Sequence, residues 1–281
     1  MMIEMTHDSY GKSDVRLMKV TRGAERHAVK EVTVDIRLQG DFEEGYYTGD
    51  NTKVLPTDTM KNTVYALARK HPVETPEQFA LLLAEHFVDS QPQISSANVA
   101  VAERPWQHLD VDDAPHPHAF TQATGERRTG VVEHHDDATT IRGGLRDLVI
   151  LKSANSGFSN FVEDQYTTLG ETDDRVLATS LEASWTYSST DLGFAALHRD
   201  IRALLVEVFA NHKSLSVQHT LYAMGERVLQ DCSDVTTIHL QMPNKHNLPV
   251  DLEPFGMDNP HQILLPIDEP SGFIEATLKR G

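Results

Sequence analysis

The sequence predicts an α+β fold built from two copies of one order of elements: two strands, two helices and two more strands. Segments with apolar residues at every second position flank helical stripes in both halves of the chain. Consecutive strands joined by short turns favour antiparallel sheets with both helices of a copy on one face. The other face of each sheet then needs a cover, which a closed ring of several subunits would provide.

The first copy is predicted from five segments, the first of which is a strand at 15–20. A second strand at 32–40 places four apolar residues on one face, because side chains alternate along a strand. Helices are predicted at 57–71 and 75–89, and a strand follows at 96–106.

The helix at 75–89 has the clearer start signal. Thr75 and Gln78 have the spacing of a capping box, and Pro76 stands at the first helical position. Large apolar residues then recur along one face of the helix. This pattern predicts a helix packed on a sheet.

The second copy repeats the order, with strands at 145–153 and 175–187, helices at 194–210 and 216–231, and a strand at 236–244. The apolar residues of both helices fall on one stripe, so core packing explains their Met and aromatic members.

The two copies meet near residues 140–147, where Gly143 and Gly144 suit a hinge. We therefore predict two repeats, 1–142 and 143–281.

Composition excludes several classes of protein. The chain has 281 residues, of which 39% are hydrophobic, so it can build a substantial core. Its net charge of −17 disfavours nucleic acid, although a local basic pocket would still bind a small anion. The apolar runs are too short for a membrane span, and the N-terminus lacks the apolar core of a secretion signal. One cysteine, Cys232, cannot form an internal disulfide, which favours a reducing cytoplasm.

Two stretches of the first half carry polar residues that a fold alone does not require. Lys12 lies after a glycine and just before a strand, where a solvated surface lysine is the common case. Thr57 and Asp58 stand at a predicted helix start, where capping is the commoner role. The N–H groups of such a helix end are also a ready anion site.

Two stretches of the second half add further candidates. Phe158 sits among small polar residues, and Arg175 opens a predicted strand, where pairing with the neighbouring Asp173 or Asp174 is the simpler hypothesis. Gln218 lies in the first turn of a helix, and Asn244 and His246 follow a predicted strand end. Together the candidates supply a planar cation, an amide, an aromatic face, a lysine and a histidine, which suits a flat, hydrogen-bonding, acidic heterocycle.

Two histidine-rich motifs, HPHAF at 116–120 and EHHD at 133–136, raise the alternative of a metal site. No paired cysteines or H-E-x-x-H sequence supports it. His116 and His118 are better interpreted as structural residues of a Pro-rich turn.

At these stretches the chain resembles the urate oxidase (uricase) family. The resemblance runs through YGKSDVRLMKV, TDTMKNTVYALA, HPHAF, FVEDQYTTLGETDDR, SVQHTLYAMGE, MPNKHN and GFIEATLKR, in order and over nearly the whole chain. It implies a tandem T-fold, with antiparallel sheets and two helices per repeat on one face. It also implies a homotetramer that encloses a tunnel, with active sites shared between subunits.

The resemblance also implies roles for single residues. Lys12, Thr57 and His246 match the family's proton relay, and Thr57 also belongs to its substrate-binding set. The other members of that set match Asp58, Phe158, Arg175, Val217, Gln218 and Asn244.

The chemistry implied is the oxidation of urate by dioxygen and water to 5-hydroxyisourate and hydrogen peroxide. The family uses no metal or organic cofactor, because the electron-rich urate anion itself reduces dioxygen. The family has glycine where this chain has Asn160, which would alter a loop without removing a functional side chain. The chain ends in LKRG and not in the peroxisomal Ser-Lys-Leu signal, which favours a cytoplasmic protein.

Two other functions remain open. A zinc-dependent pterin enzyme on the same tandem architecture would bind a similar flat ring, but it needs a zinc cluster that the sequence does not readily supply. A purine-binding relative that has lost activity is the non-enzymatic alternative. The presence of Lys12, Thr57 and His246 argues against such a loss.

Overall fold

The computed structural model describes residues 3–122, 124–135 and 137–281. Within these residues, no helix combines the length and the apolar character that crossing a membrane requires.

The chain forms two compact units. Unit 1 comprises Met1–Gly144 with Thr186–Ala195, and unit 2 comprises Leu145–Trp185 with Ala196–Gly281. The boundary between Gly144 and Leu145 falls inside one long strand, β7 (Ala138–Lys152). Gly143 and Gly144, where a hinge was expected, both lie within β7 and not in a loop.

Unit 1 contains an antiparallel sheet with strands in the order β1, β2, β3 and β6. All three strands predicted in this half are present, and each is longer than its predicted segment or close to it. The hairpin β4–β5 and strand β6 were not predicted. The strands are β1 (Tyr10–Arg22), β2 (His27–Gly40), β3 (Ile94–Arg104), β4 (Gln107–Val111), β5 (Ala114–Thr121) and β6 (Arg127–His135).

The alternation predicted for the second strand is confirmed in β2. The apolar side chains on one face of the strand belong to the core and are almost fully buried. They are Val32, Val34, Ile36 and Leu38.

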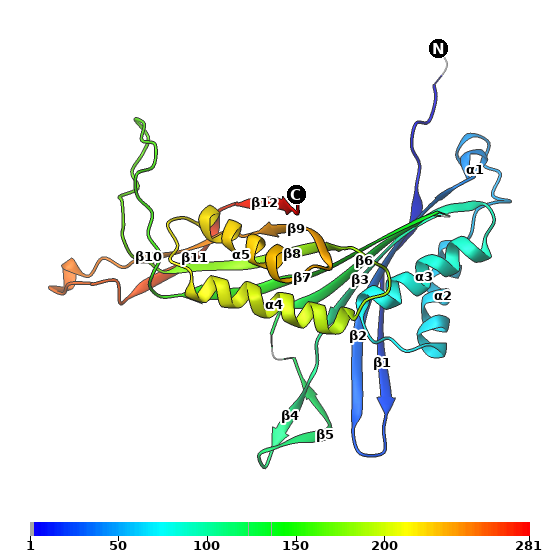
Figure 1. Ribbon diagram of the computed structural model, residues 1–281, viewed down its shortest axis with the longest axis horizontal. Coiled ribbons are helices and arrows are strands. Elements are labelled where there is room, and N and C mark those ends of the chain that lie inside the picture. The colour runs from blue at the N-terminus through cyan, green and yellow to red at the C-terminus, as the bar shows by residue number, and fades with distance from the viewer. Residues whose placement is uncertain (1–2, 123, 136) are drawn as a thin grey trace. The chain divides into compact units, whose positions relative to one another are not determined.

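Three helices belong to unit 1: α1 (Glu43–Tyr47), α2 (Thr57–Lys70) and α3 (Pro76–Ser90). Figure 1 shows α2 and α3 against the strands of this unit, and α3 packs on β3 and β6. The predicted start of α3 is confirmed, because Thr75 Oγ1 accepts a hydrogen bond from Gln78 N at 3.2 Å. The side chain of Thr75 therefore satisfies an N–H group that the helix itself leaves unpaired.

Close packing of α3 on β6 depends on Gly130. A Cβ atom at this position would lie 2.5 Å from Glu77 N and 2.7 Å from Pro76 C. Any larger residue would push the start of α3 away from the sheet. The backbone at Gly130 thus sets the distance between helix and strand.

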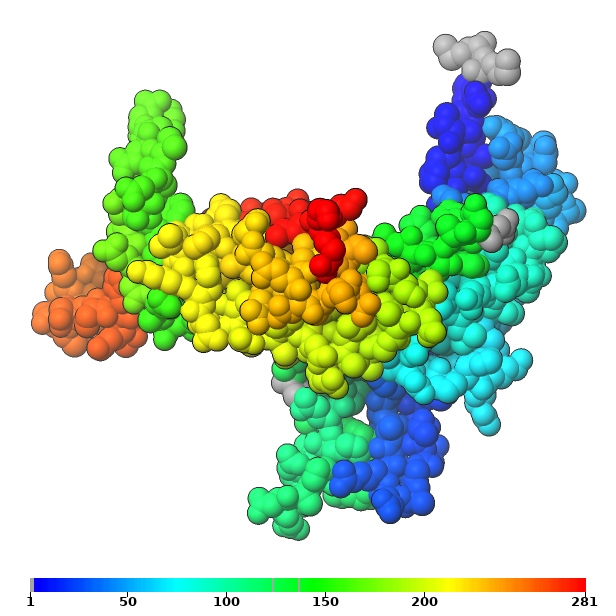
Figure 2. Space-filling model, in the orientation of Figure 1, coloured from blue at the N-terminus to red at the C-terminus, as the bar shows by residue number. Residues whose placement is uncertain are grey.

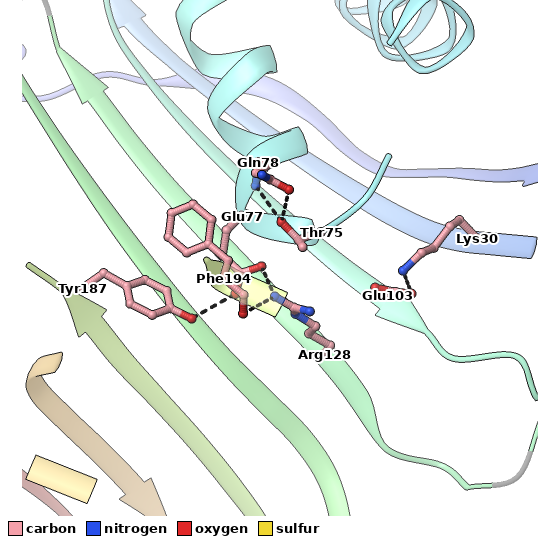
Figure 3. A network of polar contacts seen from close by, with 8 residues as sticks. All are labelled: Lys30, Thr75, Glu77, Gln78, Glu103, Arg128, Tyr187 and Phe194. Carbon is pink, nitrogen blue, oxygen red and sulfur yellow. Dashed lines mark hydrogen bonds and ion pairs between the residues drawn. The ribbon is translucent and has the colours of Figure 1, made fainter. Parts of the chain in front are cut away.

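A buried carboxylate sits beside this contact (Figure 3). The side chain of Glu77 is fully buried and accepts hydrogen bonds from Arg128 Nη2 at 2.8 Å and from Tyr187 Oη at 3.2 Å. The same Arg128 nitrogen donates to the carbonyl of Phe194 at 2.9 Å. Burial raises the pKa of Glu77, and the nearby Arg128 acts in the opposite direction. The network connects α3, β6 and the short Thr186–Ala195 segment of unit 1.

Unit 2 contains the second half of β7 and five further strands. β8 pairs with β10 and β10 pairs with β11, both antiparallel, while β9 pairs antiparallel with β12. The predicted strands at 175–187 and 236–244 correspond to β8 and β9, whereas β10, β11 and β12 were not predicted. The strands are β8 (Leu177–Tyr187), β9 (Val235–Gln241), β10 (Asn244–Pro249), β11 (Leu264–Gly272) and β12 (Glu275–Lys279).

The helices of this half are α4 (Phe194–Asn211) and α5 (Val217–Asp231), as the sequence predicted. A short 3-10 helix, η1 (Glu253–Phe255), lies between β10 and β11. α5 packs against β9 and β12 with a fully buried stripe. That stripe includes Leu221, Met224 and Val228.

The segment between β7 and β8 has little regular structure and projects from unit 2 as the green finger in Figure 2. It carries Phe158 and, near its end, Arg175. Two backbone hydrogen bonds between Phe158 and Thr172, of 2.7 and 3.0 Å, close the base of the finger.

Arg128→Met is expected to lower the free energy of unfolding by about 3–5 kcal/mol at pH 7, because it leaves the Glu77 carboxylate buried without its cation. The folded-state pKa of Glu77 lies above its unfolded value. Protonation of Glu77 at low pH therefore removes the free-energy cost of burying its charge. The deficit relative to wild type should therefore shrink as pH falls toward 5 and grow as pH rises. Chemical denaturation across this range measures it.

Arg22→Met is the matched control, because Arg22 is an exposed residue of the same unit. A deficit of equal size in both variants, or one that does not vary with pH, would contradict the role assigned to the Glu77–Arg128 pair.

Candidate functional site

The first group of predicted site residues lies in unit 1, where β1 begins beside the start of α2. Tyr10 connects the two, because its hydroxyl accepts from Leu55 N at 2.8 Å and donates to Leu55 O at 3.2 Å. Lys12 is two residues after Tyr10, and Thr57 is two residues after Leu55. The hydrogen bonds therefore bring these predicted site residues to one edge of the unit.

Backbone geometry fixes the position of Lys12 further. Gly11 approaches β2 so closely that a Cβ atom would lie 1.8 Å from Ile36 O. The pairing of β1 with β2 shifts register between Lys12 and Val15, and Asp14 adopts a left-handed conformation with φ of 56°. Lys12 thus precedes an irregularity in the strand, and its side chain is partly buried.

The structure corrects the predicted capping role of Thr57 and Asp58. Both are already helical residues, because α2 begins at Thr57 and the N-cap position is Pro56, which has no side-chain oxygen to offer. The Asp58 carboxylate instead accepts from Lys61 and, at 3.1 Å, from Asn62 Nδ2. The first-turn N–H groups of α2 therefore have no capping side chain, which is the arrangement that an anion would complete.

Electrostatics connect Asp58 with Lys12. The pKa of the exposed Asp58 carboxylate is lowered, mainly by its hydrogen bond to Lys61 and by the charge of Lys61, with a smaller contribution from the charge of Lys12. The Lys12 ammonium group is therefore near enough to the start of α2 to act on a charge there.

The second group lies in unit 2, on the finger and on α5. Gly157 N donates to Ser214 O at 2.8 Å, and Ser214 N donates to Asn155 O at 3.0 Å. Ser156 and Ser214 are each only 1% exposed. This pairing holds the residue before Phe158 against the connection between α4 and α5.

Arg175 is attached to the same point. Its backbone N donates to Ser156 O at 2.6 Å, and its guanidinium carbon lies 5.2 Å from the centroid of the Phe158 ring. Burial lowers the pKa of Arg175. Its Nε is buried and has no hydrogen-bond partner in the described part of the chain. A partly desolvated, planar donor beside an aromatic face is well suited to a flat, polar ring.

The alternative of an ion pair between Arg175 and a neighbouring aspartate is wrong. Within the described residues, Arg175 makes no ion pair with Asp173 or Asp174. The Asp174 carboxylate instead accepts from Ser156 N at 3.1 Å. It therefore supports the backbone near Arg175 and does not neutralise the guanidinium.

α5 begins at Val217, with Gln218 in its first turn. Ser216 is the N-cap residue and its side chain accepts from His219 N at 3.1 Å. Ser214 Oγ donates to Ser216 O at 3.0 Å, so the cap is connected to the buried pairing beneath the finger. Val217 is buried and Gln218 is exposed, which leaves the amide of Gln218 free to meet a ligand.

Basic and imidazole groups surround the end of α4. Lys152 Nζ donates to the carbonyl of His212 at 2.6 Å, and the His212 and His219 rings lie 4.4 Å apart. The pKa of His212 is lowered by burial and then by the charges of His219 and Lys152. His212, which lies shortly before the start of α5, is therefore neutral near neutral pH.

Asn244 and His246 follow the end of β9, as expected, and lie in the next strand, β10. The two residues are two positions apart, and in a regular strand such side chains lie on one face. The pairing of β10 with β11 changes register between them. Both line a cleft of about 470 Å³, which also includes Arg175, Lys245 and His261. Lys245 and His261 were not predicted as site residues, because no local pattern marks them.

The structure thus places Lys12, Thr57 and Asp58 in unit 1 and the other predicted site residues in unit 2. Phe158, Val217 and Gln218 do not line the cleft that contains Arg175, Asn244 and His246. They belong to the surface joined by the Ser156–Ser214 pairing.

The histidine motifs do not form a metal centre in the described residues, where no group of three or more His, Cys, Asp or Glu side chains is placed to hold a metal ion. The His116 and His118 rings meet edge to face with centroids 4.5 Å apart, and His108 Nδ1 lies 2.6 Å from His116 O in the β4–β5 hairpin. Asp136, the last residue of the second motif, lies outside the described residues.

Asn160, which departs from the resembled pattern, has a left-handed backbone with φ of 55°. Glycine adopts this conformation freely, and asparagine is among the residues that tolerate it best. The exchange of glycine for asparagine is therefore compatible with the same turn.

The chain is similar to known proteins in both sequence and structure. The sequence model of the family described as Uricase matches residues 8–133 and 141–275. The chain is 40% identical to the uricase of Arthrobacter globiformis, over 99% of this chain and 90% of that protein. It is 34% identical to the uricase of Dictyostelium discoideum, over 99% and 98% of the two chains.

Solved structures agree. The crystal structure of uricase from Arthrobacter globiformis has a TM-score of 0.94 at 40% identity and covers 100% of this chain and 96% of that one. A urate oxidase structure from Bacillus sp. TB-90 has a TM-score of 0.85 at 24% identity, with 98% and 100% covered, and supports the fold alone.

Ser216→Ala is expected to destabilise the protein by about 0.5–2 kcal/mol, because the first turn of α5 loses its cap. Ser216→Asp should retain most of the stability, since its carboxylate can accept the same N–H bond. Thermal unfolding of both variants beside wild type measures the effect. Equal losses in the two variants would show that the cap does not hold the start of α5.

Proposed function

The chain belongs to the uricase family, and from this premise we propose that it oxidises urate with dioxygen and water to 5-hydroxyisourate and hydrogen peroxide. The reaction proceeds without a metal or an organic cofactor. Urate is converted with one dioxygen and one water, so that oxygen takes up the two electrons that the purine loses. The protein holds the purine, removes a proton and positions oxygen and then water at the ring.

The observation that carries this proposal is the arrangement of Arg175 and Phe158. The guanidinium has a buried, unpartnered Nε and lies 5.2 Å from the centroid of the aromatic ring, in the residues that the structure describes. Phe158 stacks on the purine, and Arg175 donates to a carbonyl and a ring nitrogen at its pyrimidine edge. The amide of Gln218 pairs with the other pyrimidine edge, and Val217 N adds a donor.

The first group of residues completes the site from a neighbouring subunit. Thr57 and Asp58 meet the imidazole edge of the purine with the N–H groups at the start of α2, whose helix dipole favours a bound anion. The proposal therefore includes a homotetramer with active sites shared between subunits. The location of the two groups in different units of the chain supports this arrangement.

Proton transfer is assigned to Lys12, Thr57 and His246. Lys12 accepts a proton, the hydroxyl of Thr57 passes it between Lys12 and the substrate, and His246 extends the relay. Asn244 orients dioxygen and later the attacking water above the ring. The influence of Lys12 on Asp58 supports this assignment, because it places the ammonium near the residues at the start of α2.

We also retain the division into two repeats, 1–142 and 143–281, as part of this proposal. Each repeat would supply one of the two groups of site residues.

Urate added to the dialysed protein should lose its ultraviolet absorbance while dioxygen is consumed, with no cofactor supplied. Metal analysis of the same sample distinguishes the zinc-dependent pterin hypothesis, which requires stoichiometric zinc. Failure to consume urate, or activity that disappears with the metal, would overturn the proposal.

Lys12→Met is expected to lower kcat by about two orders of magnitude or more, in the range of general acid–base catalysis, while ligand affinity stays nearly unchanged. Lys70→Met is the control, because Lys70 is an exposed residue at the end of α2. Steady-state kinetics and binding of a purine analogue separate the two effects. Normal turnover in Lys12→Met would remove Lys12 from the relay.

Arg175→Ala should act mainly on binding, because it removes the bidentate donor at the pyrimidine edge. We expect the affinity for a purine analogue to fall by at least about tenfold, the scale of one charged hydrogen bond. Arg146→Ala, a change at an exposed arginine of unit 2, should leave it unaltered. Calorimetric titration measures both, and an unchanged Kd in Arg175→Ala would contradict the pose.

A further inference from the structure

The Phe158 ring has an aromatic partner to which the proposed function gives no role. Phe161 lies almost parallel to it, with ring centroids 4.9 Å apart and an angle of 14° between the planes. Parallel rings at this separation attract each other beyond the effect of buried area alone. The stack occupies one face of Phe158, and the Arg175 guanidinium carbon lies 5.2 Å from the centroid of the same ring. In the proposed pose, the purine that Arg175 holds takes the other face.

The turn between the two rings is held by specific contacts. Asn160 has a left-handed backbone with φ of 55° and lies in a bend directly before Phe161. The N–H of Asn160 donates to the Glu171 carboxylate at 2.6 Å. With the paired backbone of Phe158 and Thr172, this contact places Phe161 back over its neighbour.

The tip of the finger is a turn closed by its own hydrogen bonds, in which Asp164 N donates to Thr167 Oγ1 at 2.8 Å. Val162 is 95% exposed and Tyr166 is 80% exposed, whereas Phe158 and Phe161 are both partly buried. The ring pair is therefore less exposed than these two large side chains of the same segment. We therefore interpret the contact of Phe161 with Phe158 as one that positions the Phe158 ring.

We propose that Phe161 is a positioning residue for the substrate, which fixes the orientation of Phe158 by stacking on the face turned away from the purine. The inference rests on the proposed function, in which Phe158 stacks on urate. Without Phe161 the Phe158 ring gains rotational freedom, and part of the binding free energy is then spent on ordering it. The loss falls on ground state and transition state alike, so it changes KM and not kcat.

The test uses three substitutions of Phe161 in the full-length protein. Phe161→Ala is expected to raise KM for urate about fivefold, within the range of an aromatic pair, with kcat within about twofold of wild type. Phe161→Leu keeps the bulk without the ring and should show an intermediate change. Phe161→Tyr keeps the ring and should restore wild-type KM. Tyr166→Ala, in the same finger, should have no effect.

Binding of xanthine, a purine that lacks the third oxo group of urate, provides a second readout by calorimetry. Its Kd should rise in Phe161→Ala by the same factor as KM, while the thermal midpoint stays within about two degrees of wild type, as for a surface-exposed segment.

Three outcomes would overturn the inference. These are an unchanged KM and Kd in Phe161→Ala, an equal change in Tyr166→Ala, or a fall in kcat without a change in KM. The failure of the proposed function has a different signature, because wild-type protein itself would then leave urate unoxidised. The xanthine titration compares wild type with Phe161→Ala even in that case.

Discussion

The backbone pairing between Ser156 and Ser214 is the interaction on which the second group of site residues depends. Gly157 N donates to Ser214 O, and Ser214 N donates to Asn155 O, at a place where both serines are almost fully buried. A buried backbone group without a partner is costly, so these bonds are not readily exchanged for water. The pairing thereby fixes a projecting finger relative to a helix start.

Both arms of the site extend from this pairing. On one side, Ser156 O accepts from Arg175 N, and Gly157 leads directly to Phe158. On the other side, Ser214 Oγ donates to Ser216 O, and Ser216 caps α5 at Val217. In the proposed site, a planar ligand would contact both Arg175 and the start of α5, and the backbone pairing fixes the separation of these groups before the ligand binds. Such preorganisation lowers the entropy that binding and catalysis must otherwise supply.

Local signals account for what the sequence could predict. The alternation in β2 and the Thr75 cap of α3 are encoded within a few residues, and both are present. The β4–β5 hairpin lacks such a signal because its side chains are mostly exposed on both faces. Capping by Thr57 was wrongly expected because residue type alone does not show that the helix has already begun after Pro56.

The site was less accessible to local reasoning because its geometry is non-local. Ser156 and Ser214 are small residues with no periodicity to mark them, and their pairing spans more than fifty positions of sequence. The family resemblance indicated which residues to examine, but the hydrogen bonds that order them depend on the fold. Phe161 illustrates the limit, because only its near-parallel ring distinguishes it from the exposed apolar residues beside it.

The net charge of −17 does not conflict with an anionic substrate. Exposed charges act over a Debye length of about 8 Å at physiological salt, whereas a desolvated guanidinium is screened much less. Arg175 is partly buried, and the nearest carboxylate in sequence, that of Asp174, is occupied by Ser156 N. The guanidinium therefore supplies positive charge beside the Phe158 ring, since its carbon lies 5.2 Å from the ring centroid. An acidic exterior is therefore compatible with the proposed binding of a small, flat anion beside a desolvated guanidinium.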